Sequence, residues 1–246
     1  MRYCIISDIH ANLPALNAVI NHSQTQKIDE YICLGDIVGY GPQPTECLNL
    51  VKSLTANICA GNHDYAAVKK IETDDFNKYA LESIEWTTGI LSETDKLFLS
   101  NRLAEKISVG GFEGVHGALT NPVSDYMVNI WIAVANFKLM SANLCFNGHT
   151  HIPLIFSMNS ETKETDTIRM PISGKIYLES SVKYIINAGS VGQPRDNDPR
   201  SSYLVFDNAE LSVEYYRVEY DINSVQLKMR DVGLPDFLIT RLALGK

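Results

Sequence analysis

Metal-binding and acid/base side chains follow five short apolar runs of this 246-residue chain. Each run reads as a buried strand that ends at a polar residue. The candidate ligands are Asp8, His10, Asp36, Asn62, His116, His149 and His151. Because side chains at the ends of neighbouring strands meet at one edge of a sheet, we expect these residues to form one site.

The types of donor in this set indicate which metal ions it could bind. The set has two carboxylates, four imidazoles and one amide oxygen, and it contains no thiolate. Such oxygen and nitrogen donors suit Mn, Fe, Zn or Co rather than a structural zinc ion. Seven ligands are too many for one tetrahedral ion, but two ions that share a bridging carboxylate could use them all. The set therefore predicts a hydrolytic centre with two divalent transition metal ions.

Two amphipathic segments separate the first three apolar runs, and each has a proline near its start, Pro14 or Pro44. Proline fits the first turn of a helix because its missing N–H would have no partner there. The alternation of strands and crossover helices predicts a parallel sheet, with the run from Asn57 to Ala60 as its third strand.

The middle of the chain, from about Tyr65 to Arg102, is predicted to be mainly helical. Gly110-Gly111 then joins two strands of a hairpin, and a further helix is expected from about Met127 to Met140. Trp86 and Trp131 lie in helical stretches, and we interpret both as core residues.

Beyond Pro153 the pattern changes to short strands, followed by a helix that Asp221 caps and an apolar tail from Pro235. The predicted strands are Leu154 to Met158, Thr167 to Met170, Lys175 to Leu178, Lys183 to Ile186, Tyr203 to Phe206 and Leu211 to Val218. They predict a second, mostly antiparallel sheet. The expected fold is a four-layer α/β/β/α sandwich of two mixed sheets flanked by helices, in a single domain over residues 1–246.

In their order along the chain, these motifs resemble those of the calcineurin-like metallophosphoesterases. The matching pieces are Asp8-Ile9-His10, Gly35-Asp36, Gly61-Asn62-His63-Asp64, His116 and Gly148-His149-Thr150-His151. The stretch from Asn187 to Asp196 is similar to one in the small bacterial phosphodiesterase-like members. The resemblance implies one metal ion held by Asp8, His10, Asp36 and His151, and a second held by Asp36, Asn62, His116 and His149, so that Asp36 bridges them.

The resemblance also implies hydrolysis of a phosphate ester by a metal-activated hydroxide, with His63 as the general acid for the leaving group. Two roles are open for Asp64, which could orient His63 or cap the following helix. Arg195 could bind the substrate phosphate or form an ion pair within its own loop. His22 is interpreted as a structural histidine.

The sequence departs from one branch of this family just after Asp36. Ser/Thr protein phosphatases and symmetrical dinucleoside tetraphosphate hydrolases carry an arginine shortly after this aspartate, and the protein phosphatases also carry an aspartate that orients the catalytic histidine. This chain has Gly39 and Tyr40 at those positions. A monoester phosphate is a dianion that benefits from a guanidinium, while a diester carries a single charge. The sequence therefore favours a phosphodiesterase over a phosphomonoesterase, a protein phosphatase or a dinucleoside polyphosphate hydrolase. A non-catalytic scaffold of this fold, such as the retromer scaffold subunit, lacks the catalytic histidine that His63 would supply here.

Composition limits the classes of partner. A formal net charge of -8 works against charge-driven binding to nucleic acids, and no apolar stretch is long enough to span a bilayer. No secretory signal is recognised, and the five cysteines show no Cys-x-x-Cys spacing. We therefore expect reduced thiols and a cytoplasmic enzyme that acts on a small-molecule phosphoester.

Overall fold

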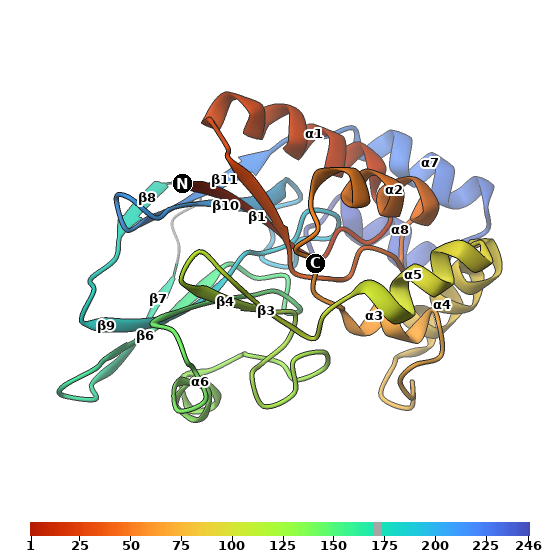
Figure 1. Cartoon of the computed structure of the whole chain (residues 1–246). Helices are drawn as coiled ribbons and strands as arrows, with labels where there is room; N and C mark the ends of the chain where they lie inside the picture. The colour runs from red at the N-terminus through yellow and green to blue at the C-terminus, as the bar shows by residue number, and fades with distance from the viewer. Residues whose placement is uncertain (170–173) are drawn as a thin grey trace.

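The computed structural model describes residues 1–169 and 174–246, and Figure 1 shows two stacked sheets with helices outside them. The first sheet has the strand order β2-β1-β10-β11-β8. Its strands are β1 (Arg2–Ile6), β2 (Glu30–Cys33), β8 (Gly174–Tyr177), β10 (Ser201–Asp207) and β11 (Ser212–Val218). β1 and β2 are parallel, and the other pairs are antiparallel.

The second sheet has the strand order β3-β4-β5-β9-β6-β7. Its strands are β3 (Lys106–Val109), β4 (Phe112–Val115), β5 (Leu144–Asn147), β6 (Leu154–Asn159), β7 (Thr165–Arg169) and β9 (Val182–Asn187). β4, β5 and β9 run parallel, while β3, β6 and β7 pair antiparallel to their neighbours. Met170, which the sequence analysis places at the end of a strand, lies outside the described residues.

Three apolar layers hold this sandwich together. Side chains such as Ile5 from the first sheet and Phe146 from the second fill the space between the sheets. The helices α1 (Leu13–Ser23) and α2 (Pro44–Leu54) cover the outer face of the first sheet, and α6 (Ile130–Phe137) covers that of the second. The prediction of two mixed sheets flanked by helices is therefore confirmed.

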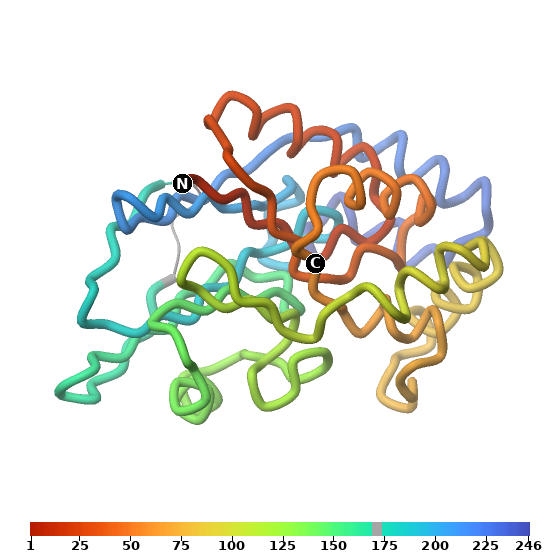
Figure 2. Tube along the Cα trace, in the orientation of Figure 1, coloured from red at the N-terminus to blue at the C-terminus, as the bar shows by residue number. Residues whose placement is uncertain are grey.

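The remaining helices gather beside one end of the sandwich (Figure 2). They are α3 (Asn62–Ala66), α4 (Lys78–Ile90), α5 (Glu93–Arg102), α7 (Ile222–Asp231) and α8 (Asp236–Leu242), and a 3-10 turn, η1 (Gln24–Gln26), follows α1. The C-terminal helices α7 and α8 pack on α4, although they lie far from it in the sequence. Val225 of α7 and Leu238 of α8 share a buried cluster with Ala80 of α4. Asp221 caps α7, as predicted, and Ser92 caps α5.

The way in which the strands are divided between the sheets differs from the prediction. Strands from the second half of the chain join both sheets, so the parallel and antiparallel pairs are interleaved. The run from Asn57 to Ala60 forms only isolated bridges, Ile58 with Cys33 and Cys59 with Ala104. It is too short for a ladder because the backbone turns into α3 directly after Gly61. The local periodicity of the sequence predicts where strands form, but it carries no information about which strands pair with each other.

Several predicted helix limits are also wrong. The helix expected from Met127 to Met140 is shorter, because the Asn129 side chain accepts a hydrogen bond from Ile132 N and starts α6 there. Residues 67–77 interrupt the predicted helical middle, and the expected apolar tail contains α8.

Trp131 is not a core residue, since it is 81% exposed. Helix α6 buries Ala133, Asn136 and Phe137 instead, and Trp86 is only partly buried. Among the described residues, no helix has both the length and the apolar character needed to cross a bilayer. All five cysteines are free and buried.

Candidate metal centre

The loops that follow β1, β2 and β5 are tied together by hydrogen bonds from backbone N–H groups. Asp8 N donates to Gly35 O at 3.0 Å, and His10 N donates to Asp36 O at 2.9 Å. From the second sheet, His149 N donates to the Asp8 carboxylate, 3.0 Å from Oδ2. The candidate ligands therefore meet as expected, but at the shared end of two sheets rather than at the edge of one.

The candidate ligand atoms form two groups that share Asp36. The first group is Asp8, His10, Asp36 and His151, and the second is Asp36, His116 and His149. Ligand atoms within each group lie within 4.8 Å of one another. Asn62 joins the second group, because its Oδ1 lies 3.3 Å from His116 Nε2. The candidate side chains are thus grouped as the family resemblance implies, and their binding of metal ions stays a prediction.

Each of the four histidines has one ring nitrogen beside a backbone carbonyl oxygen. The pairs are His10 Nδ1 with Val38 O (3.2 Å), His116 Nδ1 with Leu34 O (2.8 Å), His151 Nδ1 with Gln193 O (2.5 Å) and His149 Nε2 with Ser124 O (3.0 Å). A carbonyl oxygen only accepts, so these nitrogens carry the hydrogen and a neutral ring presents its other nitrogen as a lone pair. This arrangement is typical of histidines that bind metal ions.

His10 and His151 give the clearest sign that a cation fits between the ligands. Their Nε2 atoms lie only 3.1 Å apart. Burial lowers the pKa of both rings, so both are neutral near pH 7. Two Nε2 lone pairs at this distance cannot form a hydrogen bond, because neither atom carries a hydrogen. Asp8 Oδ1 lies 3.2 Å from His151 Nε2, and Asp36 Oδ2 lies 3.6 Å from His10 Nε2. These donors fit a divalent ion.

The two carboxylates supply negative charge to the site. Burial by itself would raise the pKa of Asp8 and Asp36, but neighbouring histidines outweigh it and hold both pKa values below the usual range. Burial would lower the pKa of His116, but Asp36 raises that pKa to about 9, so a cation bound at His116 Nε2 would replace the proton there. Because the pKa values of Asp8 and Asp36 are lowered, both carboxylates are ionised at neutral pH and can bind cations.

Five of the candidate ligands have left-handed backbone conformations. The φ angles are 53° for Asp8, 49° for His10, 52° for Asp36, 67° for His149 and 60° for His151. Each such conformation costs on the order of 1–3 kcal/mol, and such residues cluster at functional sites. The backbone is also crowded, because a Cβ at Gly61 would lie 2.0 Å from Asp36 Oδ1. Only glycine permits this approach.

His63 lies against the first ligand group, with its ring centroid 4.9 Å from that of His10. Its Nδ1 is buried without a hydrogen-bond partner in the described part of the chain. Burial lowers the pKa of His63 to about 4, although Asp36 opposes this effect. His63 therefore lies beside the candidate ligands, and its role as general acid stays a prediction.

The hydrogen bonds of Asp64 show that it acts as a helix cap, which was one of its two possible roles. Its Oδ1 accepts from Ile37 N at 2.9 Å and Val38 N at 3.2 Å, and its Oδ2 accepts from Gly61 N at 3.0 Å. Within residues 1–169 and 174–246, no hydrogen bond joins Asp64 to His63. A direct catalytic role for Asp64 stays a prediction.

Arg195 faces the same region. After burial, which is the largest cause, its cation contributes to the lowered pKa values of His63 and His151. Its Nη2 donates to Gln193 Oε1 at 3.0 Å. The loop acid Asp196 pairs with Arg217 rather than with Arg195. In the part of the chain that the structure describes, no carboxylate pairs with Arg195, so its charge could act on an anion. Elsewhere, His22 Nδ1 lies 2.8 Å from the Tyr203 hydroxyl, which fits the interpretation of His22 as a structural histidine.

Comparison with known proteins agrees with this geometry. The model of the calcineurin-like phosphoesterase superfamily domain matches residues 1–210. The chain belongs to this superfamily. It is 42% identical to a metallophosphoesterase of Sphaerobacter thermophilus, whose crystal structure it matches with a TM-score of 0.89 over 100% of this chain and 99% of that chain.

Two further relatives differ in how much of the chain they cover. An uncharacterized protein of Methanocaldococcus jannaschii is 39% identical over 247 residues, which is 98% of this chain and 97% of that protein. A symmetrical bis(5'-nucleosyl)-tetraphosphatase of Psychromonas ingrahamii is 40% identical over 63 residues, which is 24% of this chain and 23% of that protein.

Several parts of this phosphoesterase site were missed by the sequence analysis. The carbonyl groups of Val38 and Gln193 hold ligand histidines, but a backbone group leaves no signal in the side-chain sequence. Ser124 and Tyr126 lie on His149 from the loop after His116. Tyr126, the aromatic residue in that loop, was the sequence signal that could have indicated this contact with His149.

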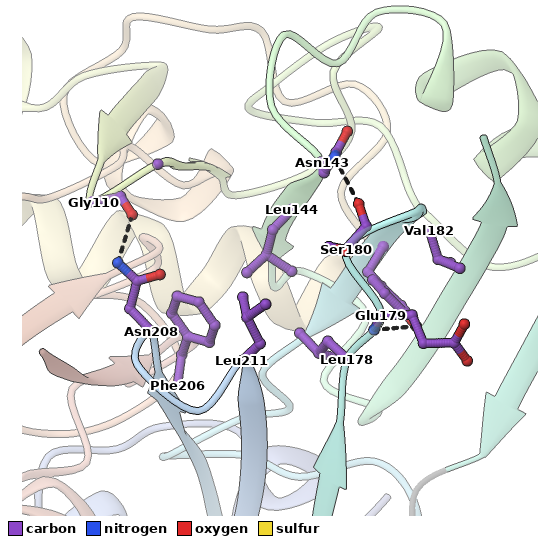
Figure 3. A pocket seen from close by; sticks show the side chains of 12 residues that line it. Gly110, Asn143, Leu144, Leu178, Glu179, Ser180, Val182, Phe206, Asn208 and Leu211 are labelled. Carbon is purple, nitrogen blue, oxygen red and sulfur yellow. Dashed lines mark hydrogen bonds between the residues drawn. The ribbon is translucent and has the colours of Figure 1, made fainter.

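A separate cavity of about 190 Å³ lies between the sheets (Figure 3). Leu144, Leu178, Phe206 and Leu211 make its wall largely apolar, and hydrogen bonds of Asn143 and Asn208 join the loops at its rim. It contains none of the candidate metal ligands, so it is not part of the metal centre.

Proposed function

We propose that this protein is a dimetal-dependent phosphoesterase that favours phosphodiesters over monoesters. The observation that carries the proposal is the place of Asp36 between two complete ligand groups. When bound, two divalent ions acidify water and neutralise the phosphoryl oxygens during in-line attack. Mn, Fe, Zn and Co all suit these oxygen and nitrogen donors.

His63 is the residue to which we assign protonation of the leaving group. It contacts the first ligand group through His10. Tyr40 and Phe76 flank its ring at centroid distances of 4.3 Å and 5.0 Å, and they restrict its movement. An anionic phosphate next to the ring favours its protonated form, which offsets the effect of burial.

The preference for diesters rests on the absence of an arginine beside the bridging carboxylate. Gly39 has a φ of +83°, and a Cβ there would lie 2.5 Å from His63 Nδ1. A side chain at this position would therefore displace His63. Without that guanidinium, the second charge of a monoester lacks a fixed partner on this side of the site.

Arg195 provides the competing possibility. Its charge acts on His63 and His151, so it could bind a monoester phosphate from the other side. The local likeness to the symmetrical bis(5'-nucleosyl)-tetraphosphatase favours a dinucleoside polyphosphate as a second candidate substrate. We rank it lower because the likeness covers only 24% of this chain.

The test compares bis-nitrophenyl phosphate with nitrophenyl phosphate at one pH and one metal concentration. We expect a higher kcat/KM for the diester, and we expect Arg195→Ala to widen the ratio. A wild-type preference for the monoester would reject the diesterase proposal and leave the metal centre intact. Diadenosine tetraphosphate in the same panel tests the second candidate.

The free, buried cysteines support a reducing compartment, and we keep a cytoplasmic location as part of the proposal. A small phosphoester remains the proposed substrate, without a nucleic-acid or membrane partner.

A further inference from the structure

The loop that follows β4 is a compact turn rather than an open connection. Gly117 N donates to Pro122 O at 2.7 Å, and Asn121 Oδ1 accepts from Val123 N and Ser124 N, each at 3.2 Å. Thr120 Oγ1 donates to Asp125 Oδ2 at 2.7 Å. These bonds fix the backbone that leads to Tyr126.

The end of this turn rests on a candidate metal ligand. Ser124 O lies 3.0 Å from His149 Nε2, so it orients that ring. The Tyr126 ring stacks on the same imidazole, with centroids 3.8 Å apart and planes at 25°. Tyr126 is nevertheless 49% exposed, whereas His149 is 3% exposed. One part of the tyrosine ring therefore covers His149, and the rest faces solvent beside the metal centre.

Charged groups of the metal centre and the Arg195 cation act on the Tyr126 hydroxyl. Burial raises the pKa of the Tyr126 hydroxyl, and the Arg195 cation gives the largest opposing effect. Asp36 and Asp8 also act on that hydroxyl. The Arg195 guanidinium lies 5.8 Å from the centroid of the Tyr40 ring. An anion at the metal centre would thus lie near both the Arg195 cation and the Tyr126 ring that covers His149.

We propose that Tyr126 is a specificity-determining residue, which packs against a planar aromatic group of the phosphoester bound at the metal centre. The inference rests on the proposed function and adds a substrate class to it: esters whose leaving group carries an aromatic or heteroaromatic ring. A fixed, half-exposed ring suits this role because it loses little conformational freedom when it binds. Aromatic pairing predicts an advantage of about 2- to 13-fold over an alkyl group.

The test uses two ligands that cannot be hydrolysed, phenylphosphonate and methylphosphonate, titrated calorimetrically into the Mn²⁺-loaded protein. We expect wild type to bind phenylphosphonate more tightly by about 2- to 13-fold. Tyr126→Phe should keep this difference, and Tyr126→Leu should abolish it with unchanged manganese content. Tyr177→Leu, which removes an exposed ring on the edge strand β8, is the matched control and should keep the difference.

Equal binding of the two phosphonates by wild type overturns the proposal without any variant. Loss of manganese from Tyr126→Leu would instead show that Tyr126 only positions His149, and this also overturns it. The proposed function is tested separately by hydrolysis. Wild type that hydrolyses bis-nitrophenyl phosphate but binds both phosphonates equally refutes the role of Tyr126 alone, whereas wild type that hydrolyses no phosphoester refutes both proposals.

Discussion

Gly39 leaves the space that the His63 ring occupies. The φ of Gly39 is +83°, which side-chain-bearing residues rarely adopt, and an added Cβ would lie 2.5 Å from His63 Nδ1 and 3.0 Å from its Cγ. The absence of a side chain at residue 39 and the position of His63 are therefore linked. In this chain the histidine occupies room that a side chain at residue 39 would need.

We predict that Gly39→Ala lowers kcat strongly without changing metal content, because it displaces His63 and not a ligand. A misplacement of about 1 Å costs up to about 10²-fold in rate. Steady-state kinetics and elemental analysis of the same sample check this. Gly89→Ala is the matched control, since nothing lies within 4 Å of a Cβ built there. Full activity of Gly39→Ala would show that the position of His63 is not critical.

Asp36→Asn should be the most damaging ligand substitution, because one carboxylate serves both ligand groups. We expect loss of bound metal. Substitution of a residue that hydrogen-bonds to a metal ligand lowers metal affinity or activity by about 10–100-fold, and the rate should fall by more than that here. Metal content after dialysis and the rate at saturating Mn²⁺ are the measurements. The exposed Asp74→Asn controls for the loss of one charge. An Asp36→Asn variant with wild-type metal content and rate would refute the bridging role.

His63→Ala should keep both metal ions and reduce the rate by about 10²–10⁴-fold, as expected for loss of a general acid. The reduction should be smaller for nitrophenyl esters than for alkyl esters, because nitrophenolate leaves without a proton. Matched substrate pairs measured at one pH check this. Equal losses for both kinds of ester would remove His63 from the role of acid.

Asp64→Ala should destabilise the fold rather than act on chemistry alone. The substitution leaves the buried N–H groups of Ile37, Val38 and Gly61 without their acceptor. An unsatisfied buried donor costs about 1–3 kcal/mol, so urea denaturation of the metal-free protein should show at least that decrease in the free energy of unfolding. Asp221→Ala, which removes only an exposed helix cap, should cost about 1 kcal/mol. If Asp64→Ala unfolded at the wild-type urea concentration but lost activity, an orienting role would be the better explanation.

The seven candidate ligands could be predicted because the sequence directly gives the type of each side chain and the order of these residues along the chain. Their left-handed backbone could not, since residues such as Asp8 and His10 carry no local preference that requires it. Nor could the carbonyl of Gln193 that orients His151, because every residue has a carbonyl group. The apolar runs predicted that strands would form. They could not predict that β1 pairs with β10, because this pairing joins residues about 200 positions apart in the sequence.

The exposure of Trp131 illustrates the same limit. Its helix is apolar on several sides, and which side packs on the sheet is decided by Ala133 and Phe137 against the second sheet. Residue type favoured burial, whereas the contact geometry exposes the indole.

The central claim is that two metal ions share Asp36. Anomalous X-ray diffraction from a crystal of the Mn²⁺-loaded protein tests it most directly. We predict two manganese peaks about 3.5–4 Å apart, one between His10 and His151 and one between His116 and His149, with the Asp36 carboxylate between them. A single peak, or two peaks that do not both contact Asp36, would contradict a dimetal centre at this position.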